Sequence, residues 1–245
     1  MRSPTNPPTL SVKNISVAYN GKTVLEDITL DIADGALCAV IGPNGAGKST
    51  FLKGVLDLVK PQGGAVSFWG ASLKKSRGRI AYMPQRAGVD WDFPVTALDV
   101  AAMGLYRQIG WGRRVTKAHK KIAADALAQV GLEEFTDRQI GQLSGGQQQR
   151  VFLARALAQN ADLYIMDEPF AGIDARSEEA ILGILRRLHG EGKTIICVHH
   201  NLQSVADYFE DAVLINRTLF AHGKAKDIIK DKALERAYGG RLMLS

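Results

Sequence analysis

The sequence predicts an α/β fold: a mainly parallel sheet with helices on both faces, a small antiparallel β layer and an inserted helical subdomain. Short apolar runs of strand length alternate with stretches of helical periodicity, which is typical of a parallel sheet. A glycine-rich loop, Gly42–Thr50, lies between one such strand and one such helix. Residues 86–160 have helix-capping patterns and no strand signal, so we expect them to form the inserted subdomain.

Length and composition bound the number of domains. The chain has 245 residues, of which 46% are hydrophobic and 23% charged, enough for one sizeable domain. We expect residues 1–9 to be a disordered tail and residues 10–245 to be that domain. No apolar run approaches the roughly 18–20 residues that cross a bilayer, and the N-terminus lacks the apolar segment of a secretory signal. A cytoplasmic protein is therefore expected.

Charge and cysteine content exclude little but favour an ordinary globular protein. The 31 Lys and Arg against 25 Asp and Glu give a net charge of +6, which suits a nucleotide binder near an anionic membrane surface. The basic residues are scattered and no arginine-rich block is interleaved with aromatics, so nucleic acid is not an expected partner. Cys38 and Cys197 lie in apolar runs and are expected to be buried hydrophobes.

The first two strands are predicted by alternation. Leu10–Tyr19 and Thr23–Ile32 alternate apolar and polar residues, and Asn20-Gly21 between them is a strong hairpin signal. Tyr19 stands just before the turn. Taken alone, it is more often a half-buried strand aromatic than a platform on which adenine stacks.

The glycine-rich loop is the strongest chemical signal. It follows a buried strand, Ala36–Ile41, and precedes apolar residues at helical spacing, and it has the phosphate-loop pattern of Gly, four residues, Gly-Lys and Ser or Thr. Backbone N–H groups at such a helix start converge on an anion, which predicts a phosphate-loop NTPase core. Lys48 is expected to reach the outer phosphates and the Ser49 hydroxyl to ligate Mg²⁺. The expected nucleotide-contacting residues here are Gly42, Pro43, Asn44, Gly45, Ala46, Gly47, Lys48, Ser49 and Thr50.

Two helices are predicted inside residues 86–160. Thr96 with Asp99 resembles a capping box that opens a helix through Met103, and Thr116 can cap a helix over Lys117–Val130. Farther on, Leu143–Arg150 is a second glycine-rich turn, and a helical run from Val151 to Gln159 follows it. A second phosphate-binding helix end suggests one triphosphate clamped from two sides.

Polar residues follow several predicted strands. Asp167 and Glu168 end the buried strand that begins at Leu163; Asp167 suits the Mg²⁺ shell, and Glu168 can polarise a water for attack on the γ-phosphate. Gln85 leaves the strand Arg79–Met83, where it can ligate Mg²⁺ or orient water, although a lone polar loop residue is commonly only that. His199-His200 end the strand Thr194–Val198.

The histidine pair is not expected to bind a metal. Adjacent residues leaving a strand point in opposite directions, so a single histidine reaching the γ-phosphate is the better interpretation. Two last strands, Asp211–Asn216 and Arg217–Ala221, are joined by a tight turn. The chemical residues all follow strands at their carboxyl ends, which is where parallel sheets bind ligands.

From about Leu10 to about Gly240 the sequence resembles the ATP-binding subunit of ABC transporters. The most specific likeness is Leu143–Gln147, the family's signature, in the right order between the phosphate loop and the strand with the carboxylates. Matched residue by residue, the resemblance implies adenine stacking for Tyr19, contact with Mg²⁺ and the membrane partner for Gln85, communication across a dimer for Asp174, and γ-phosphate contact for His200. Asn201 after that histidine, Gly172-Ile173 before Asp174 and Tyr164 are mild departures.

The resemblance also implies ATP and Mg²⁺ as cofactors and a second copy of the chain as partner. Each ATP would lie between one phosphate loop and the other subunit's Ser144, Gly145, Gly146 and Gln147. The implied catalytic residues are Glu168, His200, Lys48 and Gln85, and the implied ligands of Mg²⁺ are Ser49, Gln85 and Asp167.

The loop Val89–Thr96 and Gly110-Trp111 resemble the manganese, zinc and iron uptake branch of that family. This implies an integral membrane permease docking near Gln85, Trp91, Phe93 and Trp111, an extracytoplasmic metal-binding protein as an indirect partner, and a place on the cytoplasmic face of the membrane. The alternative for Trp91 and Phe93 is that they close the subdomain's own core. The transported metal is not expected to touch this chain, which lacks a plausible ligand cluster.

Two other functions compete. The first is a soluble ABC-type ATPase, such as a cofactor-assembly or DNA-handling factor. Non-transport members of the family commonly carry two fused cassettes or long coiled insertions, which this sequence lacks, but the sequence does not exclude a single cassette in a cofactor-assembly machine. A GTPase or small-molecule kinase is disfavoured, because a guanine-reading motif is missing and the signature stretch would be unexplained.

Overall fold

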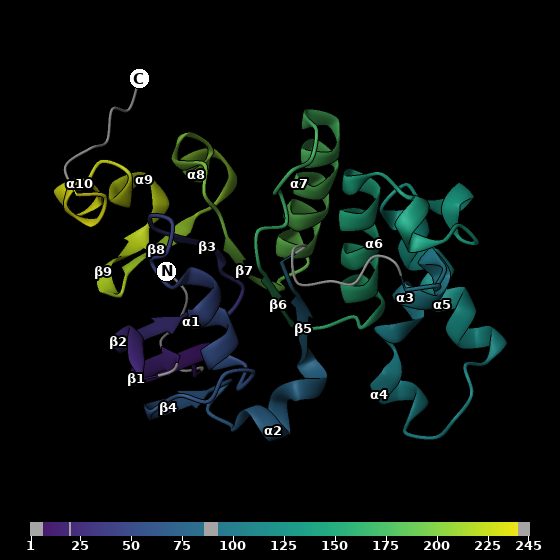
Figure 1. Ribbon diagram of the computed structural model, residues 1–245, viewed down its shortest axis with the longest axis horizontal. Helices are drawn as coiled ribbons and strands as arrows, with labels where there is room; N and C mark the ends of the chain where they lie inside the picture. Colours follow the sequence, from purple (N-terminus) through teal and green to yellow (C-terminus); the bar gives the residue numbers. More distant parts are fainter. Residues whose placement is uncertain (1–6, 20, 86–92, 240–245) are drawn as a thin grey trace. The chain divides into compact units, whose positions relative to one another are not determined.

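Residues 7–19, 21–85 and 93–239 are described by the computed structural model in Figure 1. The chain forms two compact units, residues 1–77 with 191–245 and residues 78–190. The sequence predicts one domain with an insertion at 86–160. The second unit extends beyond those bounds because it also contains two strands and a long helix that flank the expected insertion.

The antiparallel layer of the first unit has the expected hairpin. Its strand order is β2-β1-β4, from β2 (Lys22–Ile32), β1 (Leu10–Tyr19) and β4 (Gly63–Ser67). Tyr19 pairs with Lys22, so the two strands meet at the end of the hairpin where the sequence predicts its turn; Asn20 lies outside the described residues.

The ordered chain begins before Leu10. Thr9 is buried, its hydroxyl donates to Asp34 Oδ1 at 2.8 Å, and its carbonyl accepts from Trp69 N at 3.2 Å. Residue 9 is thus part of the packed unit, although the expected tail included it; residues 1–6 lie outside the described part of the chain.

The parallel strands of the first unit are apolar throughout. β3 (Leu37–Ile41) pairs in parallel with β7 (Thr194–Val198) and β8 (Asp211–Asn216), and β9 (Thr218–Lys224) pairs antiparallel with β8. Every residue of β3 and β7 is buried, which is typical of strands covered on both faces. Cys38 and Cys197 lie in these two strands, are free and buried as predicted, and burial raises the pKa of the Cys38 thiol. The unit's helices are α1 (Lys48–Val55), α2 (Leu73–Ser76), α8 (Leu202–Tyr208), α9 (Ala225–Ile228) and α10 (Lys232–Ala237).

The second unit combines a strand pair with a group of helices. β5 (Ile80–Met83) pairs in parallel with β6 (Leu163–Met166). The helices α3 (Ala97–Met103), α5 (Lys117–Gln129) and α6 (Gly145–Ala158) pack against one another. The unit also contains α4 (Tyr106–Ile109), α7 (Ala175–Gly190) and two short 3₁₀ turns, Glu133–Phe135 and Ile140–Gln142.

The predicted helix starts are confirmed for α3 and α5 and wrong for α6. Thr96 and Asp99 form the expected capping box, and Thr116 caps α5. α6 begins at Gly145 rather than Val151, because Ser144 and Gln147 form another capping box: Ser144 N donates to Gln147 Oε1 at 2.8 Å. The signature glycines therefore lie inside the first turn of a helix.

None of the helices within the described ranges is long and apolar enough to span a bilayer.

Candidate functional site

The phosphate loop of the first unit connects β3 to α1 as predicted. Gly42 and Gly47 leave no room for a side chain: a Cβ on Gly42 would overlap the carbonyl oxygen of Ile215, and one on Gly47 would lie 2.6 Å from Leu25 Cδ2. Gly47, the N-cap of α1, also has φ +93°, a backbone conformation that favours glycine. The loop is packed against its neighbours and leads into the N-terminus of α1, and the N–H groups of a helix N-terminus favour an anion.

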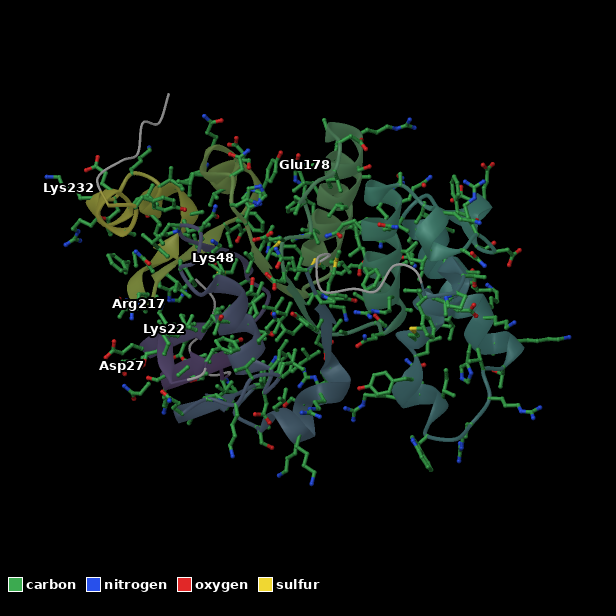
Figure 2. The ribbon with its side chains drawn as sticks, in the orientation of Figure 1. Lys22, Asp27, Lys48, Glu178, Arg217 and Lys232 are labelled. Atoms are coloured by element: carbon green, nitrogen blue, oxygen red, sulfur yellow. The ribbon has the colours of Figure 1, made fainter. Side chains whose placement is uncertain are left out.

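Lys48 is the first residue of α1 and is labelled in Figure 2. Its side chain is mostly buried, and Nζ donates to the carbonyl oxygens of Gly42 at 2.8 Å and Pro43 at 2.9 Å. The ammonium is thus held across the loop itself, where a phosphate chain on the helix end would lie. Ser49 follows in the first turn of the same helix.

Tyr19 and His200 belong to the same unit. Tyr19 ends β1 with 41% of its surface exposed, which leaves its ring able to stack on a base. His199 and His200 follow β7 and differ sharply: His199 is 1% exposed, while His200 is exposed. The expectation that the two side chains diverge is consistent with this difference.

His199 is held as a structural residue. Its Nε2 lies 2.7 Å from Ser204 Oγ, and its ring packs against Phe209 at 5.4 Å between centroids. Burial, together with the nearby His200, lowers the pKa of His199 to about 4, so this ring is neutral near pH 7. Of the pair, only His200 is available to a ligand.

In the second unit, the chain leaves β6 at two carboxylates. Asp167 is fully buried, and its N–H donates to Met83 O at 2.9 Å, which fixes it beside the end of β5. Glu168 has φ +53°, and its Oε2 accepts a hydrogen bond from Gln85 Nε2 at 2.8 Å. The structure therefore brings Gln85 and Glu168, 83 residues apart, into direct contact.

The signature residues contact the segment that precedes α7. A Cβ on Gly146 would lie 2.8 Å from Ser177 Oγ and 3.5 Å from Asp174 Oδ2, so the glycine permits close packing. Asp174 accepts hydrogen bonds from Ser177 N at 2.9 Å and Ser177 Oγ at 3.0 Å, and these bonds lower the pKa of its carboxyl. Asp174 and the signature, far apart in sequence, are neighbours within this unit.

Oxygen groups of the kind that Mg²⁺ prefers are present in both units: the Ser49 hydroxyl in the first, and the Asp167 carboxylate and Gln85 amide in the second. The described residues contain no cluster of three or more His, Cys, Asp or Glu side chains that would hold a metal without such help from a nucleotide.

The aromatics expected to meet a membrane partner are exposed where the structure describes them. Phe93 is 58% exposed and Trp111 is fully exposed, which argues against Phe93 closing the subdomain's core. Trp91 lies outside the described residues. A hollow of about 690 Å³ lies beside Trp111, with apolar walls from α3 and α4. Its lining includes Leu98, Ala102, Met103, Tyr106, Ile109, Trp111 and Val115.

Comparison with known proteins decides the family. The ABC transporter family model matches residues 25–171, more than half of the chain. The chain belongs to the ABC transporter family. It is 50% identical over 233 residues to the zinc transport system ATP-binding protein TroB of Treponema pallidum, covering 95% of this chain and 88% of that protein. It is equally identical to the manganese transport system ATP-binding protein MntB of Bacillus subtilis, covering 95% and 93%.

Solved structures of ABC cassettes share the fold. A nucleotide-free ATP-binding cassette from an ABC transporter matches with a TM-score of 0.82 at 24% identity, covering 94% of this chain and 98% of that one. A dimeric bacterial ABC transporter cassette matches with a TM-score of 0.77 at 29% identity, covering 88% and 98%. The predicted α/β phosphate-loop fold is confirmed, and the chain is a nucleotide-binding ABC ATPase.

Proposed function

We propose that this ABC ATPase hydrolyses ATP to power the import of a divalent metal ion, manganese, zinc or iron, through a membrane permease. The observation that carries the substrate class is the 50% identity, over 95% of the chain, to ATP-binding proteins of zinc and manganese transport systems. No comparison supports the soluble cofactor-assembly factor.

The proposed chemistry is phosphoryl transfer from ATP to water, driven largely by electrostatics. Lys48 and the start of α1 bind the outer phosphates, and Tyr19 stacks on the adenine. Glu168 orients and deprotonates the attacking water, and His200 stabilises the γ-phosphate. Ser49, Asp167 and Gln85 would supply oxygen ligands for a Mg²⁺ ion bound with ATP, and the ion would offset negative charge on the phosphates.

A second copy of the chain completes the proposed site. ABC cassettes act as dimers and with membrane permeases, and a dimeric cassette is among the matched structures. We propose that Ser144, Gly145, Gly146 and Gln147 of one copy contact the ATP held by the other, since they form a second helix N-terminus suited to an anion. Asp174, packed beside Gly146, then reports on that contact across the dimer.

The permease is proposed to dock at the hollow beside Trp111 and at the exposed Phe93, near Gln85 and Trp91, on the cytoplasmic face of the membrane. Charged side chains also line the hollow: three exposed basic residues, Arg107, Arg113 and Lys120, and one acidic residue, Asp99. Asp99 itself is engaged in the capping box of α3. Apolar walls with a net positive charge fit an amphipathic permease segment that carries carboxylates.

Copurification from native membranes tests this assignment against the soluble-factor alternative. We expect the tagged wild-type chain to retain an integral membrane protein, and the Arg107→Glu/Arg113→Glu variant to lose it while hydrolysing ATP normally in isolation. Lys74→Glu/Lys75→Glu, a matched charge change on exposed lysines of the first unit, should retain it. A wild-type chain that copurifies with no membrane protein would contradict the transporter assignment.

A further inference from the structure

The backbone of Glu168 is held by a side chain from the helix that carries the signature. Gln149 lies on α6 with 1% of its surface exposed, and its Nε2 donates to the carbonyl oxygen of Glu168 at 3.2 Å. The same carbonyl accepts a second hydrogen bond from Ala171 N at 3.1 Å. Two donors from different segments thus fix the orientation of the peptide that follows Glu168.

That orientation matters because the Glu168 backbone is unusual. Its φ of +53° is one that residues with a side chain rarely adopt, and such a conformation persists only where the surroundings hold it. The direction of the Cα–Cβ bond follows from the backbone, so the carbonyl anchor also directs the carboxylate. At its other end the carboxylate meets Gln85 Nε2 at 2.8 Å.

We propose that Gln149 is a positioning residue for Glu168: its amide holds the carboxylate of the base where it can reach the attacking water. This inference rests on the role of Glu168 under the proposed function. Gln149 touches neither nucleotide nor water in this account. It acts through the backbone of the residue that does, and a small misplacement of a catalytic group costs a large factor in rate.

Gln149 lies close to the signature on the same helix, α6. The helix begins at Gly145, so the signature glycines and Gln149 share its first turns, about 6 Å apart along the axis at 1.5 Å per residue. A helix is stiff over that length. A displacement of the signature, when it binds the ATP of the other copy, therefore also displaces Gln149 and the Glu168 backbone to which it is bonded. The Gln149 side chain therefore links the ATP held by the other copy to the base, Glu168, of its own copy.

The neighbouring glutamine supplies a matched control. Gln148 is also buried on α6, with 4% exposed, and its Nε2 donates to the carbonyl oxygen of Ile140 at 3.1 Å. That carbonyl, like that of Glu168, keeps a second backbone donor, Leu143 N at 3.2 Å. Replacing either glutamine by leucine removes one buried amide donor from a carbonyl that retains another, but only Gln149 bears on Glu168.

The test compares steady-state ATP hydrolysis by Gln149→Leu and Gln148→Leu in the full-length chain. We expect Gln149→Leu to lower kcat by about tenfold or more, with unchanged KM, unchanged affinity for a fluorescent ATP analogue and a Tm equal to that of the control. Equal kcat in the two variants, or a loss confined to nucleotide affinity, would overturn the proposal. If the leucine variants do not fold, Gln149→Met and Gln148→Met, which are similar in length and more adaptable, take their place.

A second comparison separates this inference from the function on which it rests. In a Glu168→Gln background the Gln149→Leu change should cost no further rate, because the group that it positions is already gone. The same loss in both backgrounds would show that Gln149 acts elsewhere. Normal hydrolysis by Glu168→Gln alone would instead remove the base assignment, whatever Gln149 does.

Discussion

Single residues of this chain hold backbone conformations that their chemistry requires. Because Gly42 and Gly47 have no side chains, the phosphate loop can pack closely against Ile215 and Leu25. The loop pattern predicts glycine at both positions. The left-handed backbone of Glu168 could not, since glutamate has no preference for it and the partners that hold it are distant in sequence. The contact between Gln85 and Glu168 could likewise not be predicted from the sequence, because only folding brings the two segments together.

Glu168→Gln is predicted to keep ATP binding and lose nearly all turnover. The amide has the shape of the carboxylate but cannot accept a proton from water, and loss of a general base costs about 10²–10⁴ in rate. Phosphate release and equilibrium binding of a fluorescent ATP analogue measure the two effects separately. Glu179→Gln, an exposed change on α7, should hydrolyse ATP like wild type; comparable rates for both variants would sink the assignment.

Gly42→Ala is predicted to destabilise the first unit. The added methyl group would overlap the carbonyl oxygen of Ile215, a backbone atom that cannot turn away, and φ is +152° there. We expect the free energy of unfolding to fall by about 2 kcal/mol or more. Urea unfolding measures it, with Gly183→Ala as control, because that position in α7 is open and helical. A Gly42→Ala variant as stable as this control would show that the loop packs differently.

Among the elements, most strand limits can be predicted to within a residue or two, whereas β9 continues to Lys224, three residues past the predicted end at Ala221. Runs such as Thr194–Val198 are apolar, short and bounded by polar residues, so their limits are visible in sequence. Apolar periodicity alone predicts that α6 starts at Val151. The earlier start at Gly145 is set by the capping box of Ser144 and Gln147, a signal present in the sequence.

Ser144→Ala is predicted to weaken α6 and ATP hydrolysis together. The capping hydroxyl accepts from Gln147 N at 3.3 Å, and loss of such a cap costs about 1 kcal/mol. Thr96→Ala removes the equivalent cap of α3, where the hydroxyl accepts from Asp99 N at 3.1 Å, and should lower stability similarly. Only Ser144→Ala should also lower ATPase activity, measured at an enzyme concentration above which the rate per enzyme no longer rises. Equal ATPase activity in the two variants would exclude Ser144 from the nucleotide site.

For the whole molecule, the order of the motifs predicts the family, and the structure shows that the chain divides into two compact units. The order of phosphate loop, signature and carboxylates is visible in sequence, and the family match agrees with it. The second unit comprises residues 78–190 and includes the paired strands β5 and β6, whose apolar signal resembles that of the strands of the first unit.

The stability of the fold is predicted to fall as the pH drops from about 6.5 to about 4. His199 has a pKa lowered to about 4 from 6.5 by burial, so the unfolded chain binds a proton in this window and the native chain does not. The stabilisation is complete above the unfolded pKa and is lost as the pH falls toward the folded one, by at most about 3 kcal/mol. Tm measured across this window should fall less for His199→Phe; an identical slope would assign the acid sensitivity to other groups.

If ATP hydrolysis by this chain drives metal uptake, the metal content of the cell depends on the phosphate-loop lysine. Manganese, zinc and iron accumulation would be measured in the native cell with wild type, Lys48→Ala and, as an expressed control, the exposed-site variant Lys60→Ala. We predict that Lys48→Ala abolishes uptake of one of these metals and that Lys60→Ala leaves all three unchanged. Unchanged accumulation of all three metals with stably expressed Lys48→Ala would contradict the account.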